Sequence, residues 1–85
     1  MDIDKISEEL GSATNIRFSR LVKICEQYFG KPRTKGSHHI FKTPWPGDPR
    51  INLQEEKGGT AKPYQVKQVI QALQRLKEQE DKHGG

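Results

Sequence analysis

Cysteine is almost absent from this 85-residue sequence, in which Cys25 is the only one. A single cysteine excludes both an intrachain disulfide and a cysteine-based zinc cage, and it is typical of a protein from a reducing compartment. Cys25 falls within an apolar stripe, where a free thiol behaves as a small buried hydrophobic side chain. We therefore predict that Cys25 is a core thiol and not a nucleophile.

Long apolar runs are also absent. No stretch approaches the roughly 20 residues needed to cross a bilayer, and the polar start Met1-Asp2-Ile3-Asp4-Lys5 lacks a signal-peptide layout. Only 31% of the residues are hydrophobic, which is enough for one modest core. We expect a soluble cytoplasmic protein without membrane contact, folded as a single domain over residues 1–85.

Positive charge is in mild excess, with a formal net charge of +4. Such an excess is common on ordinary soluble domains, but it also favours anionic partners. The acidic residues gather mainly at the two ends and at Glu55-Glu56. The basic residues in or beside the predicted sheet are Lys31, Arg33, Lys35, Lys42 and Arg50. A basic sheet between less basic flanks is suited to contact with a phosphate backbone.

A short N-terminal helix is predicted over residues 2–10. Ile3, Ile6 and Leu10 have helical spacing behind a possible cap at Asp2, and Gly11 is the expected stop. We expect this helix to be marginal.

Two longer helices are predicted from broader apolar stripes. One starts from a cap at Ser19 and ends at Gly30, and the other has Pro63 in its first turn. Their stripes consist of Leu21, Val22, Ile24, Cys25, Tyr28 and Phe29, and of Val66, Val69, Ile70, Leu73 and Leu76. After Leu76 the chain becomes strongly charged, so we expect residues 77–85 to form a frayed tail.

Three short strands are predicted between the longer helices, over residues 31–35, 38–41 and 50–54. Glycine adopts turn conformations that other residues resist, so Gly36-Ser37 could join the first two strands as a hairpin. Successive strand side chains point to opposite faces. Phe41 and the alternating Ile51 and Leu53 therefore define the core face. The residues assigned to the open face are His38, Ile40, Lys42, Arg50, Asn52 and Gln54.

This order of elements predicts an α+β fold. Two apolar helix stripes and one apolar sheet face must bury each other, which a two-layer α-β-β-β-α sandwich with an antiparallel sheet achieves. We place its core at about residues 16–76, with residues 1–15 as a short extra helix and connector.

Two loops contain residues of ambiguous role. Trp45 lies in the proline-rich segment 43–49, where it could cap one edge of the core or stack on an unpaired base. Gly58-Gly59 superficially resembles a phosphate cradle, but the glycine-lysine-serine or threonine ending is missing, so we discount a P-loop.

His38 is the residue on the open face best suited to catalysis. An imidazole takes or gives a proton near neutral pH, and a cation such as Lys42 could hold a phosphate. A histidine pair on a strand is more often simply surface, and the residues alone favour that alternative. His39 points to the opposite face, so the pair is a poor metal site.

The order of motifs resembles that of the HicA family, small mRNA-cleaving toxins of bacterial toxin-antitoxin systems. A helix and a glycine precede the signature Gly36-Ser37-His38, Phe41 follows it, and Lys62-Pro63 opens the last helix. The resemblance covers about residues 16–76. Family members often have a proline and a second histidine after the third strand, where this chain has residues 53–56, and a glycine-threonine pair in place of Tyr64-Gln65.

The resemblance implies a double-stranded-RNA-binding-domain-like fold and a metal-independent endoribonuclease without cofactors. Its catalytic residue would be His38, a general base that takes the proton of a ribose 2′-hydroxyl. Lys42, Lys35 or Arg50 would stabilise the charge that develops on the phosphate. The expected RNA contacts are Lys35, Ser37, Lys42, Trp45, Arg50 and Asn52.

The implied partners are mRNA and an antitoxin of the HicB type. Two other classes stay open: a non-catalytic RNA-binding module of the same fold, and an adaptor that pairs only with a protein.

Overall fold

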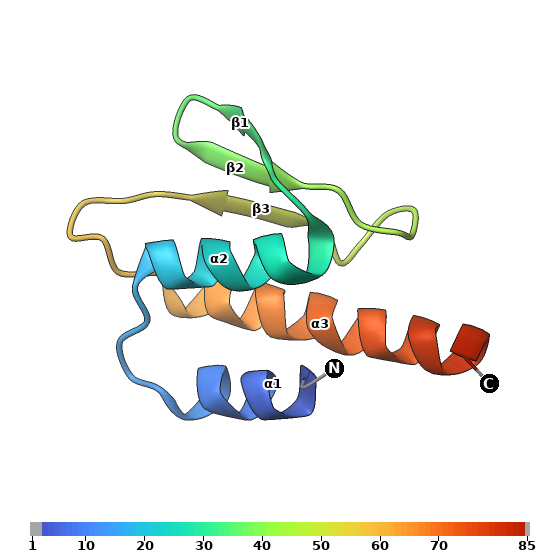
Figure 1. The fold of residues 1–85 in the computed structure, drawn as a ribbon. Helices are drawn as coiled ribbons and strands as arrows, with labels where there is room; N and C mark the ends of the chain where they lie inside the picture. The colour runs from blue at the N-terminus through green and yellow to red at the C-terminus, as the bar shows by residue number, and fades with distance from the viewer. Residues whose placement is uncertain (1–2, 85) are drawn as a thin grey trace.

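A computed structural model describes the backbone of residues 3–84 and the side chains of residues 3–80. Its elements, in chain order, are α1 (Ile3–Ser12), α2 (Phe18–Phe29), β1 (Arg33–Lys35), β2 (His38–Phe41), β3 (Ile51–Gln54) and α3 (Pro63–Gly84). The predicted α+β class and the sequence of elements are thus confirmed. Figure 1 shows the sheet above and the three helices below it.

The sheet is antiparallel with strand order β1-β2-β3. Gly36 has φ +61°, which suits the first central position of a two-residue hairpin turn and confirms the predicted turn between β1 and β2. Phe41, Ile51 and Leu53 are buried, while Asn52 and Gln54 are exposed. The predicted alternation of core and open faces is therefore confirmed.

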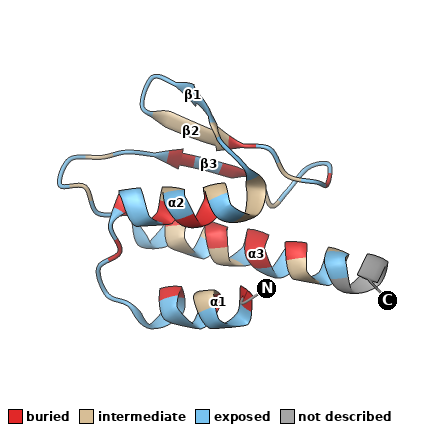
Figure 2. Ribbon diagram, in the orientation of Figure 1, coloured by how far each residue is buried: buried red, intermediate tan, exposed pale blue. Residues whose placement is uncertain are grey.

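The helices α2 and α3 cover one face of the sheet, and the buried side chains lie between the two layers (Figures 1 and 2). Leu21 and Cys25 of α2 and Val69 and Leu73 of α3 are fully buried. The strand β1 differs, because all three of its residues are exposed. It extends the sheet beyond the area that the helices cover.

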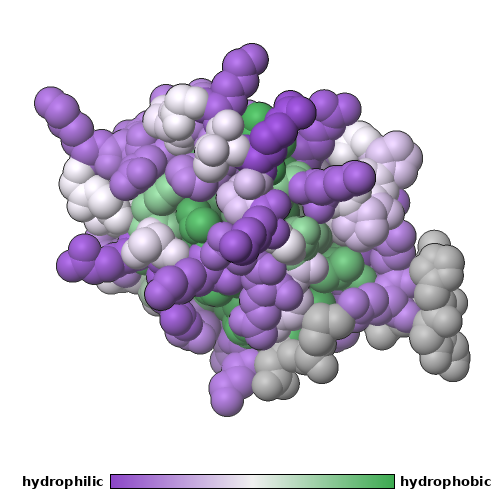
Figure 3. All heavy atoms as spheres, turned by 45° about the horizontal axis from the view of Figure 1, so that its top comes forward, coloured by the Kyte–Doolittle hydropathy of each residue, from purple (hydrophilic) through white to green (hydrophobic). Residues whose placement is uncertain are grey.

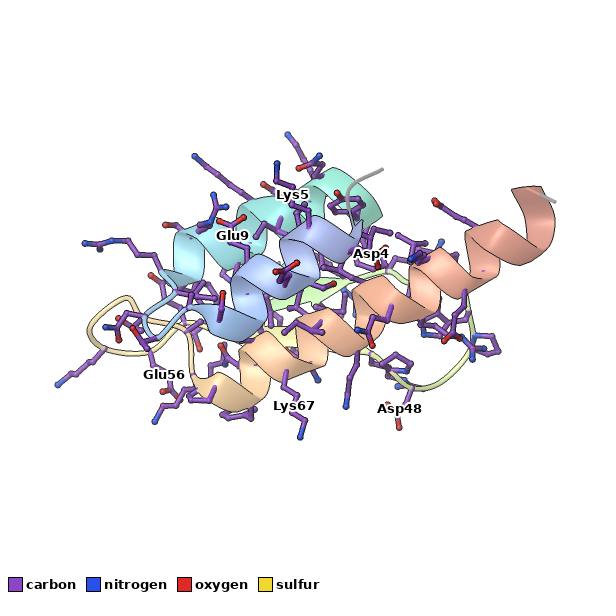
Figure 4. The ribbon with its side chains drawn as sticks, turned by 90° about the horizontal axis from the view of Figure 1, so that it is seen from below. Asp4, Lys5, Glu9, Asp48, Glu56 and Lys67 are labelled. Atoms are coloured by element: carbon purple, nitrogen blue, oxygen red, sulfur yellow. The ribbon has the colours of Figure 1, made fainter. Side chains whose placement is uncertain are left out.

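The helix α1 is more firmly packed than the sequence suggested. Ile3 and Leu10 are each only 2% exposed and belong to the same core as the sheet. Figure 4 shows α1 on the side of α2 and α3 that faces away from the sheet, and its close packing is against α3. Glu9 forms an ion pair with Arg20 of α2, and Asp4 pairs with Lys77 of α3. The helix that was expected to be marginal instead forms a third layer beneath the two-layer sandwich.

Two predicted helix ends are wrong. Gly11 lies inside α1, which continues to Ser12. The second helix begins at Phe18 after Arg17, which makes no side-chain cap, and the Phe18 amide instead donates to the Gly59 carbonyl at 2.8 Å. A partner distant in the chain thus replaces the predicted cap at Ser19.

The C-terminal tail prediction is also wrong for most of its length, because α3 continues from Leu76 to Gly84. Contact with α1, including the Lys77–Asp4 ion pair, stabilises the first turn beyond the predicted end. Gly85 lies outside the described residues. None of the described helices is both long and apolar enough to cross a membrane.

Candidate active site on the open sheet face

The strand β2 separates the two histidines, as the alternation predicted. His39 points toward the helices, where its ring meets that of Phe18 edge-on with 5.3 Å between the ring centroids. Its Nδ1 is buried and has no hydrogen-bond partner. His38 lies on the other face, directly after the turn at Gly36-Ser37. Only His38 is therefore placed to meet a ligand on the open face.

The imidazole of His38 is held by a hydrogen bond across the sheet. Its Nδ1 lies 3.0 Å from Oδ1 of Asn52, on the neighbouring strand β3. An amide oxygen only accepts hydrogen bonds, so this contact needs the proton on Nδ1. In the neutral ring, Nε2 then carries the free lone pair. The contact with Asn52 thus orients the His38 ring on the open face.

The pairing register of the three strands identifies the neighbours of His38 on this face. Lys35 of β1 and Gln54 of β3 are its direct partners on either side. Residues directly opposite on an antiparallel pair share a face, with Cβ atoms about 5 Å apart. Arg33 pairs with Ile40 in the same way, so it also belongs to the open face. Lys35 is therefore the cation directly beside His38, and Arg33 lies diagonally from it on the same strand.

Lys42 and Arg50 lie on the same side but farther away. Lys42 follows β2 four residues after His38, which corresponds to about 13 Å along a strand. Continuing the pairing beyond Phe41 and Ile51 places Arg50 opposite Lys42. Both are exposed. They can contact a phosphate farther along a bound strand, whereas Lys35 is the cation beside the imidazole.

Figure 3 turns this side of the molecule forward and shows hydrophilic side chains over much of it, with hydrophobic atoms between them. On the described strands, the residues of this face are Arg33, Lys35, His38, Ile40, Asn52 and Gln54. None of these side chains is acidic, so the face is positively charged. Ser37, in the turn, is exposed beside it.

Trp45 does not belong to the open face. It is 7% exposed, its indole N–H donates to the Pro49 carbonyl at 2.9 Å, and its ring meets Phe29 edge-on. The guanidinium of Arg75 lies 5.9 Å from its ring centroid. The core-edge interpretation is thus confirmed. An enclosed ring has no free face for a base, so the expected RNA contact at Trp45 does not fit the structure.

Cys25 is fully buried, as predicted. Burial, with a smaller contribution from the Glu26 carboxylate, raises the pKa of its thiol to about 12. A thiol with this pKa is protonated at neutral pH and is not an active nucleophile. Among the residues that the structure describes, no group of three or more histidine, cysteine or acidic side chains is arranged to hold a metal.

The sequence pattern identified Arg33 as a basic residue of the sheet but did not assign it to the open face. That assignment was within reach, because a two-residue turn at Gly36-Ser37 dictates which residues pair across the hairpin. A supporting contact behind the site was not: Gln65 is 1% exposed, and its Nε2 donates to the Gln54 carbonyl at 3.0 Å, which links β3 to α3. No local pattern indicates that a glutamine at a helix start is buried.

Comparison with known proteins gave no match from a family model, a curated protein or a solved structure.

Proposed function

We propose that this protein is a metal-independent endoribonuclease that cleaves mRNA in the cytoplasm, as a toxin of the HicA type, with His38 as the general base. The observation that carries the proposal is the His38 ring, held by Asn52 at 3.0 Å on a cation-bearing sheet face. The signature Gly36-Ser37-His38 supports it, because the turn lies at the start of this strand. The order helix, three strands, helix also suits the double-stranded-RNA-binding-domain-like fold of that family.

The proposed reaction needs only groups of the open face and of RNA. Nε2 of His38 takes the proton of a ribose 2′-hydroxyl, and the resulting oxygen attacks the adjacent phosphorus. The bond from phosphorus to the 5′-oxygen breaks, and that oxygen takes a proton from the imidazolium or from water. The products are a 2′,3′-cyclic phosphate and a 5′-hydroxyl end. Lys35 stabilises the negative charge that grows on the phosphate.

The test is cleavage of an RNA transcript in excess chelator by the wild type and two histidine variants. Removing a general base lowers such rates by about 10²- to 10⁴-fold, which we expect for His38→Ala. His39→Phe is the matched control, since it keeps a ring against Phe18 and removes only the core-side imidazole. DNA of the same sequence should stay intact, because it lacks the 2′-hydroxyl. Unchanged cleavage by His38→Ala would contradict the proposal.

A non-catalytic RNA-binding module is the second candidate, because the cationic face suits phosphate binding with or without cleavage. Filter binding separates the candidates. A binding module keeps its RNA affinity in His38→Ala and shows no cleavage in any variant. An adaptor for a protein partner would show no RNA affinity at all.

We further propose a HicB-type antitoxin as the protein partner, bound over the open face around His38 and Lys35. Acidic groups on the partner would complement the cations and speed association. The faces of α2 and α3 that carry the apolar stripes are already buried in the core. Amide shifts in an NMR titration should therefore cluster at residues 33–54. Shifts confined to α3 would contradict occlusion of the site.

A further inference from the structure

We propose that Asn52 is a positioning residue that holds the proton of His38 on Nδ1 and so makes Nε2 the basic nitrogen. The inference about the tautomer depends on geometry alone. Its consequence for cleavage rests on the proposed function, and the experiment below separates the two.

The strand β3 presents Asn52 from a rigid support. The residues on either side, Ile51 and Leu53, are fully buried, so the backbone at Asn52 is fixed from both sides. Asn52 itself is exposed and pairs directly with Ile40. His38 is therefore its diagonal neighbour, which is within reach of longer side chains on one sheet face.

The two side chains directly opposite His38 do not accept a hydrogen bond from its Nδ1. Gln54 is the direct partner of His38, yet the hydrogen bond of the imidazole goes to Asn52. The other flanking side chain, Lys35, has only donors and cannot accept the Nδ1 proton. Among the strand residues beside His38, Asn52 is thus the one that determines the tautomer.

This arrangement matters for a base that must work in one orientation. The hydrogen bond keeps Nε2 free for the substrate, and it persists after Nε2 gains a proton, because both ring nitrogens of the imidazolium are donors. Asn52 therefore favours the product of proton transfer without touching the reacting atoms. Without the bond, the ring could rotate, or it could carry its proton on Nε2. Nε2 would then have no lone pair to accept the proton of the substrate.

The tautomer is measured directly by ¹⁵N NMR of histidine-labelled protein, at a pH where the ring is neutral. We expect His38 to carry its proton on Nδ1 in the wild type and in Gln54→Ala, the matched control. In Asn52→Ala the population should move toward the Nε2 proton, and Asn52→Asp should restore the wild-type state, since a carboxylate also accepts from Nδ1. A wild-type proton on Nε2, as would occur with the amide of Asn52 reversed, or an unchanged tautomer in Asn52→Ala, would overturn the inference.

Cleavage provides the second readout. For Asn52→Ala we expect kcat to fall by at least about tenfold, a part of the 10²- to 10⁴-fold typical of a general base, and this fall should exceed any loss of RNA affinity. Asn52→Asp should recover part of the loss. A tenfold loss of RNA affinity without any loss of kcat would make Asn52 an RNA contact instead. If the wild type cleaves no RNA, the proposed function fails, and the NMR result alone decides the tautomer.

Discussion

Burial determines the chemistry available to individual side chains in this protein, and Cys25 is the clearest case. Its thiol has a pKa raised from 9.0 to about 12, mainly because burial disfavours the thiolate. Between these values the unfolded chain loses the proton while the folded protein keeps it. The unfolded state then binds fewer protons, so the free energy of unfolding falls as pH rises.

The expected difference is measurable by denaturant titration. From pH 8 to pH 10, the wild type should lose about 1.4 kcal/mol more stability than Cys25→Ala, which lacks the titrating group. Other groups that titrate in this range are common to both proteins and cancel. Parallel pH dependences in the two proteins would show that the thiol is accessible. A thiol reagent at pH 7.5 should likewise react with Cys25 only after unfolding.

Turns and helices impose opposite requirements on two of the glycines. Gly36 has φ +61°, a conformation that costs other residues about 1–2 kcal/mol, and an added Cβ would meet nothing within 4 Å. Gly11 also has open space around it but lies within α1. Gly36→Ala should therefore destabilise the protein by about 1 kcal/mol through conformation alone. Gly11→Ala should stabilise it by about 0.5 kcal/mol. Thermal unfolding of both variants tests the pair, and a shift of the same sign in both would be inconsistent with these backbone conformations.

The helix α1 should contribute to global stability as a part of the core. Leu10 is 2% exposed, so Leu10→Ala should cost about 2–5 kcal/mol in the free energy of unfolding. Glu8→Ala, on the exposed side of the same helix, should change it by less than about 0.5 kcal/mol. If α1 were a detachable appendage, both variants would unfold like the wild type.

The proposed RNA binding depends on the cations of the open face, among them Lys35, which pairs directly with His38. Each phosphate contact with single-stranded RNA contributes about −0.7 to the slope of log K against log salt concentration. Lys35→Ala and Lys42→Ala should each flatten this slope by about that amount. Lys5→Ala, on the opposite side of the molecule, is the control (Figure 4). Equal slopes in all three variants would mean that RNA does not bind this face.

The two lysines of the face should also differ in their effect on cleavage. Lys35→Ala should slow cleavage more than Lys42→Ala, because of these two lysines only Lys35 pairs with His38.

Most of the fold was predictable because its signals are local. Alternation at residues 38–41 and 51–54 is set by strand geometry, which sends neighbouring side chains to opposite faces wherever the strand lies. Gly36 marked the turn for an equally local reason. The placement of His38 on the open face and of His39 toward the helices followed from these two facts.

The sequence by itself thus determined the order of elements, the core faces of β2, β3 and the two longer helices, and the candidate base. Only the tertiary structure decided the packing of α1, the burial of Trp45 and the bond between His38 and Asn52. These three features depend on residues far apart in the chain. Asn52 meets His38 through the register of β2 against β3, across an irregular loop whose conformation no periodic pattern specifies. Long-range contacts of this kind form only when the whole core packs, so they cannot be predicted from any single segment.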